Sequence, residues 1–189
     1  MLRSSLVVLL VAFSASASAE DFDYNYFSLG YGRVDFDNVN ADGDGFNAGG
    51  SYAINDTFHV FADYGMANLD GGVDATEFGA GIGWHTGLSD VVDLVAGLSY
   101  EYVELDAPAI SSVDDSGIGL GVGLRFAASD MLELNAGISY VDLNDSGSDT
   151  AFGVGGLYDV TDAFSVGLGA SWSDDASSYT LSGRFYFGE

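Results

Sequence analysis

The chain has 189 residues, a formal net charge of −25 and no cysteine. A surface this acidic repels nucleic acid, and a chain without cysteine has no disulfide, no thiol nucleophile and no thiolate metal site. The length corresponds to one ordinary domain, and 27 glycines with a single proline favour closely paired strands over a disordered acidic chain.

The first element along the chain is a predicted secretory signal peptide at residues 1–19. Arg3 supplies a positive start, Leu6 to Phe13 form an apolar core, and Ala17 to Ala19 provide a small-residue cleavage site. The apolar core is too short for a transmembrane helix, which needs roughly 20 residues. We therefore expect export by the general secretory (Sec) route and a mature single domain over residues 20–189.

Ten segments with alternating apolar and polar residues follow. A period of two predicts β-strands that have two different faces. Short connections that each carry one Asp alternate with connections that are more acidic and generally longer, so one hairpin is repeated about five times. We expect the strands at residues 22–36, 43–54, 58–69, 75–86, 91–105, 116–127, 131–143, 150–159, 164–173 and 178–187.

Two architectures fit such strands, a secreted β-sandwich and a membrane β-barrel. Across residues 117–126, apolar residues alternate with glycine, which weakens a solvated strand but suits a face that curves into a narrow lumen. The apolar faces carry almost no charge, and aromatic residues such as Trp84 and Tyr102 lie near strand ends, as interfacial girdles require. We therefore predict an all-β fold, a ten-stranded antiparallel up-and-down transmembrane β-barrel that is monomeric. An eight-stranded barrel is the alternative if residues 150–173 fold differently.

The last predicted strand carries an assembly signal. Its sequence, YTLSGRFYFGE (179–189), resembles the C-terminal β-signal by which the barrel assembly machinery recognises outer-membrane proteins, although Gly188 and Glu189 follow the aromatic residue that is usually terminal. Together with the signal peptide and YNYFSLGYG (24–32), it makes the whole chain similar to the small OmpA/OmpX-type outer-membrane barrels. This resemblance implies a place in the outer membrane of a Gram-negative bacterium.

Two internal segments carry a narrower resemblance. GSYAINDTFHVFADYG (50–65) and GAGIGWHTGLSDVVDLVA (79–96) are similar to one group of small proteobacterial outer-membrane proteins, some of which have been labelled secreted quorum factors. The resemblance implies that a secreted or vesicle-borne signalling role is one possible function.

Strand parity predicts which charged side chains face the lumen. Arg125 and Glu133 are equidistant from the turn at residues 127–131 and share inward parity, so we expect them to pair. His59 and His85 are expected opposite each other, with Asp93 on the next strand near His85. Two histidines and an aspartate could bind a divalent metal or respond to pH, but ordinary lumen histidines are the simpler interpretation, and we predict no metal and no cofactor.

Further lumen residues complete the predicted charge network. Arg184 points inward on the last strand, and Asp63, Glu77 and Glu101 occupy the half of the lumen farther from the short turns. Because an unpaired buried arginine is strongly destabilising, each inward arginine should have acidic partners. The network either fills the space of a closed lumen or gates a narrow pore.

The opposite rim carries Arg33 and the acidic first loop. Arg33 faces outward, toward lipopolysaccharide phosphates, if its strand has no bulge, and inward if it has one. The loop DFDNVNADGDG (35–45) matches the start of an EF-hand, but Gly49 stands where the twelfth ligand would be Glu, so an EF-hand is rejected. Acidic loops of this kind either remain solvated or bridge to lipopolysaccharide through divalent cations.

Three functions remain open from the sequence. The first is a structural or surface-exposed outer-membrane protein with a largely closed lumen, the second is a narrow cation-preferring channel, and the third is the signalling factor. We do not expect an enzyme, because no G-x-S-x-G or H-E-x-x-H motif occurs and both histidines are predicted inside the lumen.

Overall fold

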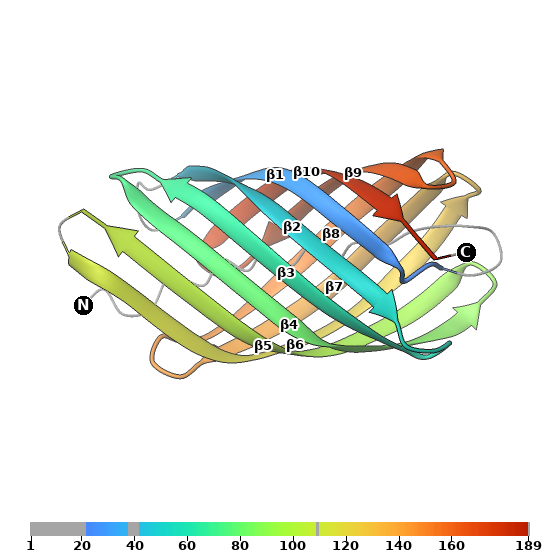
Figure 1. The fold of residues 1–189 in the computed structure, drawn as a ribbon, viewed down its shortest axis with the longest axis horizontal. Helices are drawn as coiled ribbons and strands as arrows, with labels where there is room; N and C mark the ends of the chain where they lie inside the picture. The colour runs from blue at the N-terminus through green and yellow to red at the C-terminus, as the bar shows by residue number, and fades with distance from the viewer. Residues whose placement is uncertain (1–21, 38–41, 109, 189) are drawn as a thin grey trace.

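The computed structural model describes residues 22–37, 42–108 and 110–188, which form a closed barrel of ten antiparallel strands (Figure 1). Each strand pairs with its neighbours in the sequence, and β1 pairs with β10. The prediction of a ten-stranded up-and-down barrel is confirmed, and the eight-stranded alternative is wrong. The strands are β1 (Tyr26–Phe36), β2 (Gly43–Ala53), β3 (Phe58–Leu69), β4 (Val73–Ser89), β5 (Val92–Ala107), β6 (Ile110–Ser129), β7 (Leu132–Leu143), β8 (Gly147–Thr161), β9 (Phe164–Trp172) and β10 (Ala176–Tyr186). Within the described part of the chain, no helix is long and apolar enough to cross a membrane.

The pairing of the first and last strands leaves the sheet without a free edge. All eleven residues of β1 pair with β10, from Tyr26 opposite Tyr186 to Phe36 opposite Ala176. In lipid, each unpaired backbone N–H or C=O group costs several kcal/mol, because no water is present to bond it. Closure therefore satisfies the backbone in the way that a bilayer requires.

The barrel has two different ends, which we call the turn end and the loop end. The turn end carries the connections at residues 54–57, 90–91, 130–131 and 162–163, and there the Phe187 backbone N–H donates to the Asn25 carbonyl at 3.1 Å. The loop end carries the connections at residues 37–42, 70–72, 108–109, 144–146 and 173–175. In outer-membrane barrels the short turns face the periplasm and the other end faces outward.

Most connections at the loop end are shorter than the sequence predicted, because strands continue through the acidic segments. β4, β5 and β6 contain 17, 16 and 20 residues, whereas a transmembrane strand needs about 9–11. Glu104 lies opposite Asp114 on the β5–β6 hairpin, and Asp114 falls within residues 106–115, which were expected to form a loop. The hydrogen bonds between paired strands join backbone groups and do not depend on side-chain polarity. The sheet therefore continues beyond the band that faces lipid.

The outward face of the barrel is a broad apolar surface. Ile118 is 57% exposed, while Leu98 and Tyr100 face outward and Asp93 is buried, as the alternation predicted. A soluble monomer rarely exposes a continuous apolar area of this size, whereas lipid covers it in a membrane. The face predicted to contact lipid is therefore the outward one.

The inward face is crowded enough to require glycine. At Gly83 an added Cβ would overlap the imidazole of His59, and at Gly79 it would lie 2.8 Å from an oxygen of Asp63. Glycine lets long polar side chains from neighbouring strands lie across these positions. The glycine-rich strand faces seen in the sequence thus make room for the lumen side chains.

Candidate functional site in the lumen

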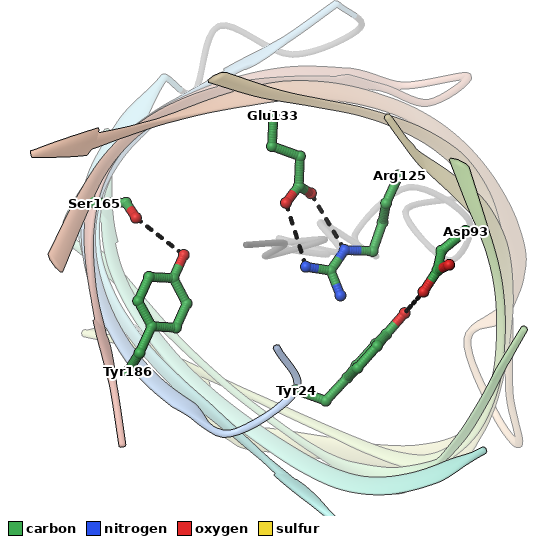
Figure 2. Close-up of polar contacts among 6 residues, drawn as sticks. All are labelled: Tyr24, Asp93, Arg125, Glu133, Ser165 and Tyr186. Atoms are coloured by element: carbon green, nitrogen blue, oxygen red, sulfur yellow. Dashed lines mark hydrogen bonds and ion pairs between the residues drawn. The ribbon is translucent and has the colours of Figure 1, made fainter. Parts of the chain in front are cut away.

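A bidentate ion pair between Arg125 and Glu133 lies in the lumen near the turn end. Arg125 on β6 donates from Nε to Glu133 Oε1 and from Nη2 to Oε2, both at 3.2 Å, and Figure 2 shows the pair inside the barrel. Arg125 is 4% exposed and Glu133 is fully buried. Two parallel charge-assisted bonds hold the guanidinium in one orientation, so this pair is a rigid element of the lumen.

The register of this pair differs from the prediction. Arg125 lies opposite Asn135, and Glu133 lies opposite Ala127, so the two charged residues are diagonal neighbours. The turn falls at residues 130–131, later than the sequence suggested, and a β-bulge adjoins it. A shift of two residues preserves the face on which a side chain lies, so the contact forms despite the wrong register.

The chain before β1 enters the lumen instead of extending the sheet. Residues 22–25 were expected to belong to a strand over 22–36, but β1 begins at Tyr26. The pairing of β1 with both neighbours begins at Tyr26, which lies opposite Ser51 and Tyr186, although β2 itself continues to Ala53. Asn25 still bonds both neighbours, because its carbonyl accepts from the Phe187 N–H and its side-chain Oδ1 accepts from the Ala53 N–H. Before Asn25 the backbone turns inward and carries Tyr24 into the lumen (Figure 2).

Tyr24 is the centre of this inserted segment. Its hydroxyl donates to Asp93 Oδ2 at 3.0 Å, and its ring stacks on His85 with centroids 3.7 Å apart. The Arg125 guanidinium lies 4.5 Å from the ring centroid of Tyr24 and 4.5 Å from that of Phe22. Sequence reasoning missed Tyr24, although the available signal was that the first predicted segment, 22–36, is longer than its predicted partners at 43–54 and 178–187.

The two histidines contact each other directly. His59 Nδ1 and His85 Nδ1 are 3.1 Å apart, and both rings are buried. His59 lies opposite Gly83 and not opposite His85, because the β3–β4 turn is centred one residue earlier than predicted. A hydrogen bond between two Nδ1 atoms requires one of them to be an acceptor, so at least one ring is neutral. Among the described residues, no group of three His, Asp or Glu side chains could hold a metal ion.

We call the six residues that these contacts join the polar plate. It contains five residues of the predicted charge network together with Tyr24. Its members are Tyr24, His59, His85, Asp93, Arg125 and Glu133.

Arg184 lies beside the polar plate without an acidic partner. It is 1% exposed, and its guanidinium lies 4.0 Å from the ring centroid of Tyr26 and 6.0 Å from that of Tyr186. Among the described residues no carboxylate is within ion-pair distance of Arg184, so the expectation of an acidic partner is wrong here. The Tyr186 hydroxyl donates to Ser165 Oγ at 3.0 Å and extends this second polar group (Figure 2), since the Ser165 proton goes to Asp159.

Glu101 belongs to a separate acidic group near the middle of the barrel. Glu101 and Asp63 both lie opposite Gly79, one on each neighbouring strand, and Ser99 donates a short hydrogen bond to Glu101. With Glu77 they line a cavity of about 170 Å³ that extends to the polar plate. The structure therefore does not bring Glu101 into contact with the other predicted network residues.

The loop end of the lumen is apolar, which the sequence analysis did not predict. We call Val34, Phe36, Leu69 and Ala176 the apolar cluster; all four are buried and pack together inside the barrel. All four point into the lumen, so the inward face is not polar over its whole length. The signal was present in the sequence, because valine or leucine replaces the polar residue at the loop end of several strands.

Arg33 faces outward at the rim of the loop end. It donates to Asp35 at 2.7 Å and to Asp42 at 2.9 Å, and its side chain is 60% exposed. β1 pairs without a bulge, which decides between the two predicted orientations.

Comparison with known proteins agrees with this architecture. The family model of the outer membrane protein beta-barrel domain matches residues 5–155. The chain belongs to this family. Its apolar outward band therefore faces the outer membrane of a Gram-negative bacterium.

The chain is similar to several solved structures at low sequence identity. The KdgM porin is 14% identical, with 85% of this chain and 99% of that chain covered and a TM-score of 0.49. The NanC porin is 9% identical, covering 86% and 100%, with a TM-score of 0.50. OprG from Pseudomonas aeruginosa is 11% identical, covering 92% and 100%, with a TM-score of 0.46. No curated protein matches the chain.

Proposed function

We propose that this protein is a surface-exposed, structural outer-membrane β-barrel whose lumen is closed at both ends. The polar plate closes the turn end and the apolar cluster closes the loop end. The single observation that carries the proposal is the insertion of Tyr24 into the lumen. There Tyr24 contacts His59, His85, Asp93 and Arg125.

The energetics of the polar plate support a stable closure. Removing one partner of a buried ion pair costs about 3–5 kcal/mol, because the remaining charge is uncompensated. Arg125 and Glu133 therefore resist separation, and Tyr24 packs against this fixed guanidinium. Ring stacking on His85 adds a second contact that must break before the segment can leave.

The apolar cluster supports closure at the other end by a different mechanism. Narrow hydrophobic constrictions exclude water and ions without a moving part. Val34, Phe36 and Leu69 are each less than 10% exposed, so their packing leaves little accessible surface at that level. Ion passage then requires both closures to open.

Conductance in a planar bilayer tests this proposal. The refolded wild type should be silent, and so should Tyr24→Ala and Phe36→Ala, because each variant keeps one closure. The double variant Tyr24→Ala/Phe36→Ala should show discrete conductance steps. Arg33→Ala, which alters an exposed outward arginine, is the matched control and should remain silent.

Two outcomes would count against the proposal. Discrete steps in the wild type would show an open lumen, and a silent double variant would mean that other side chains fill the barrel. Either result would show that the polar plate and the apolar cluster are not what closes the lumen.

The second candidate function is a narrow cation-preferring channel. The cavity of about 170 Å³ with Asp63, Glu77 and Glu101 in its lining favours this alternative, because carboxylates attract cations in a confined space. Cation-selective steps in the wild type would favour it over the closed barrel.

The remaining proposals concern partners and fate. We infer a non-enzymatic monomer that leaves the cytoplasm by the Sec route and is inserted by the barrel assembly machinery through its C-terminal strand. The predicted signal peptide over residues 1–19 lies outside the described residues.

Pairs of like-charged residues lie directly opposite each other at the outer rim, Asp74 with Asp106 and Glu104 with Asp114. Because such pairs repel each other, they support a role for divalent cations that would bridge these carboxylates to lipopolysaccharide.

The narrower family resemblance leaves a signalling role as the last alternative. Quorum-factor activity would require release of the intact protein, alone or in vesicles. Undamaged protein in a culture medium that contains no other outer-membrane proteins would favour that alternative over a barrel that stays in the membrane.

A further inference from the structure

A second, smaller cavity lies along β8, β9 and β10 inside the barrel. Its volume is about 70 Å³, enough for a few water molecules or one small anion. Glycines on β8 and β9 create the space, since a Cβ at Gly155 would lie 2.7 Å from Asn135 Oδ1. Its polar lining consists of hydroxyl, amide and guanidinium side chains, from Ser28, Asn47, Asn135, Ser171, Ser178, Thr180, Ser182 and Arg184.

Arg184 brings a buried positive charge to this cavity. Its side chain is 1% exposed, and its Nε and Nη1 atoms have no hydrogen-bond partner among the described residues. A guanidinium carries five N–H donors and no acceptor, and leaving such donors unsatisfied in a buried site is costly. The ring of Tyr26 offers Arg184 a π face, which does not satisfy N–H groups in the guanidinium plane.

A second unsatisfied donor lines the same cavity. Asn47 Nδ2 is buried and has no hydrogen-bond partner among the described residues. Ser171 and Ser178 bond each other at 2.8 Å, so these two hydroxyls already share a hydrogen bond. The cavity therefore joins two unrelated donor groups, from β2 and from β10, that both lack an acceptor.

The nearby carboxylates do not fill this need. Glu133 directs both oxygens to Arg125, and Asp159 accepts a short hydrogen bond from Ser165. Both lie close enough to Arg184 to interact with its charge, yet neither reaches it as a hydrogen-bond acceptor. The missing group is an acceptor that fits about 70 Å³ and favours a cation.

We propose that this cavity is a binding site for a small carboxylate of the size of formate or acetate. Arg184 is the principal donor, and the Asn47 amide is the second. A planar carboxylate matches the fork of a guanidinium, and its negative charge strengthens each bond. Neither the closed lumen nor the channel alternative requires such a site, so the inference goes beyond both.

Formate binding to the refolded protein in detergent micelles tests the proposal. The probe is sodium formate at fixed ionic strength, and the readout is broadening of the formate proton NMR signal. The wild type should broaden it saturably. Arg184→Met should weaken binding at least about tenfold, because hydrogen bonds to a charged group are lost. Arg33→Met is the matched control, since it removes an outward arginine far from the cavity, and it should bind formate as the wild type does.

A neutral probe and a second variant complete the design. Formamide has nearly the shape of formate without its charge, and it should not compete. Asn47→Ala keeps both buried arginines, so it decides the matter if Arg184→Met does not refold, and it should weaken binding several-fold. The proposal is overturned if the wild type shows no saturable broadening, if Arg184→Met or Asn47→Ala binds formate as the wild type does, or if formamide competes equally.

Discussion

The two ends of the lumen carry opposite chemistry. The turn end is crossed by hydrogen bonds, an ion pair and stacked rings, whereas the loop end is packed with aliphatic and aromatic side chains. Polar closure depends on geometry, because each donor must meet its acceptor. Apolar closure depends on volume, because a methylene lost from a packed site leaves a cavity. The same barrel thus tolerates different substitutions at its two ends.

This contrast follows from where each end gets its side chains. The turn end receives an additional segment, residues 22–25, which brings Tyr24 to charged residues from other strands. The apolar cluster is built from strand residues whose inward positions are occupied by Val34, Phe36 and Leu69. A polar network that spans a lumen needs such long side chains and an inserted segment, while an apolar layer needs only neighbouring strands.

The largest expected effect is at the polar plate. Glu133→Ala should lower the free energy of unfolding by about 3–5 kcal/mol, because it leaves the Arg125 charge buried without its bidentate partner. Urea unfolding of the protein refolded into lipid vesicles measures the change. In the double variant Arg125→Met/Glu133→Leu much of this loss should be recovered, since both charges of the pair are removed together. Equal losses in the single and double variants would mean that packing, and not the charge, dominates this site.

A smaller effect is expected at the apolar cluster. Leu69→Ala should cost about 3 kcal/mol through lost packing and the cavity that remains. Leu168→Ala is the matched control: Leu168 is 69% exposed on the outward face, where lipid fills the space that the substitution leaves. The same urea unfolding assay compares the two. If both variants lose the same stability, the cluster is no better packed than the lipid-facing surface.

The smallest loss of stability is expected from a substitution that disturbs the contact between His59 and His85 in the polar plate. Gly83→Ala should cost about 1–3 kcal/mol, because the new Cβ displaces the His59 ring. The displacement should separate the two Nδ1 atoms, which imidazole NMR signals of His59 and His85 would report. Gly71→Ala tests the glycine effect without this contact, since its φ of 86° strains alanine in a turn where nothing lies within 4 Å. Unchanged imidazole signals in Gly83→Ala would contradict the steric explanation.

Part of the candidate site could be predicted because strand parity survives errors of register. Arg125 and Glu133 were expected to pair, and they do so although each lies two residues from its predicted partner position. His59 and His85 meet for the same reason. Arg184 was predicted to point inward, but an aromatic ring and not a carboxylate lies against it. Parity decides the face of a side chain, while its neighbours depend on turns and bulges that local sequence specifies only weakly.

The sequence by itself determined the antiparallel up-and-down barrel and the face that lipid covers, because a period of two with apolar and glycine-rich faces has few other solutions. The structure decided for ten strands over the eight-stranded alternative. Only the tertiary structure decided that residues 22–25 enter the lumen, since their path depends on where distant strands stop pairing. It also decided which buried donors find acceptors. The Nε and Nη2 atoms of Arg125 do, whereas the Nε and Nη1 atoms of Arg184 find none among the described residues, because hydrogen bonding depends on positions that strands far apart in the sequence set together.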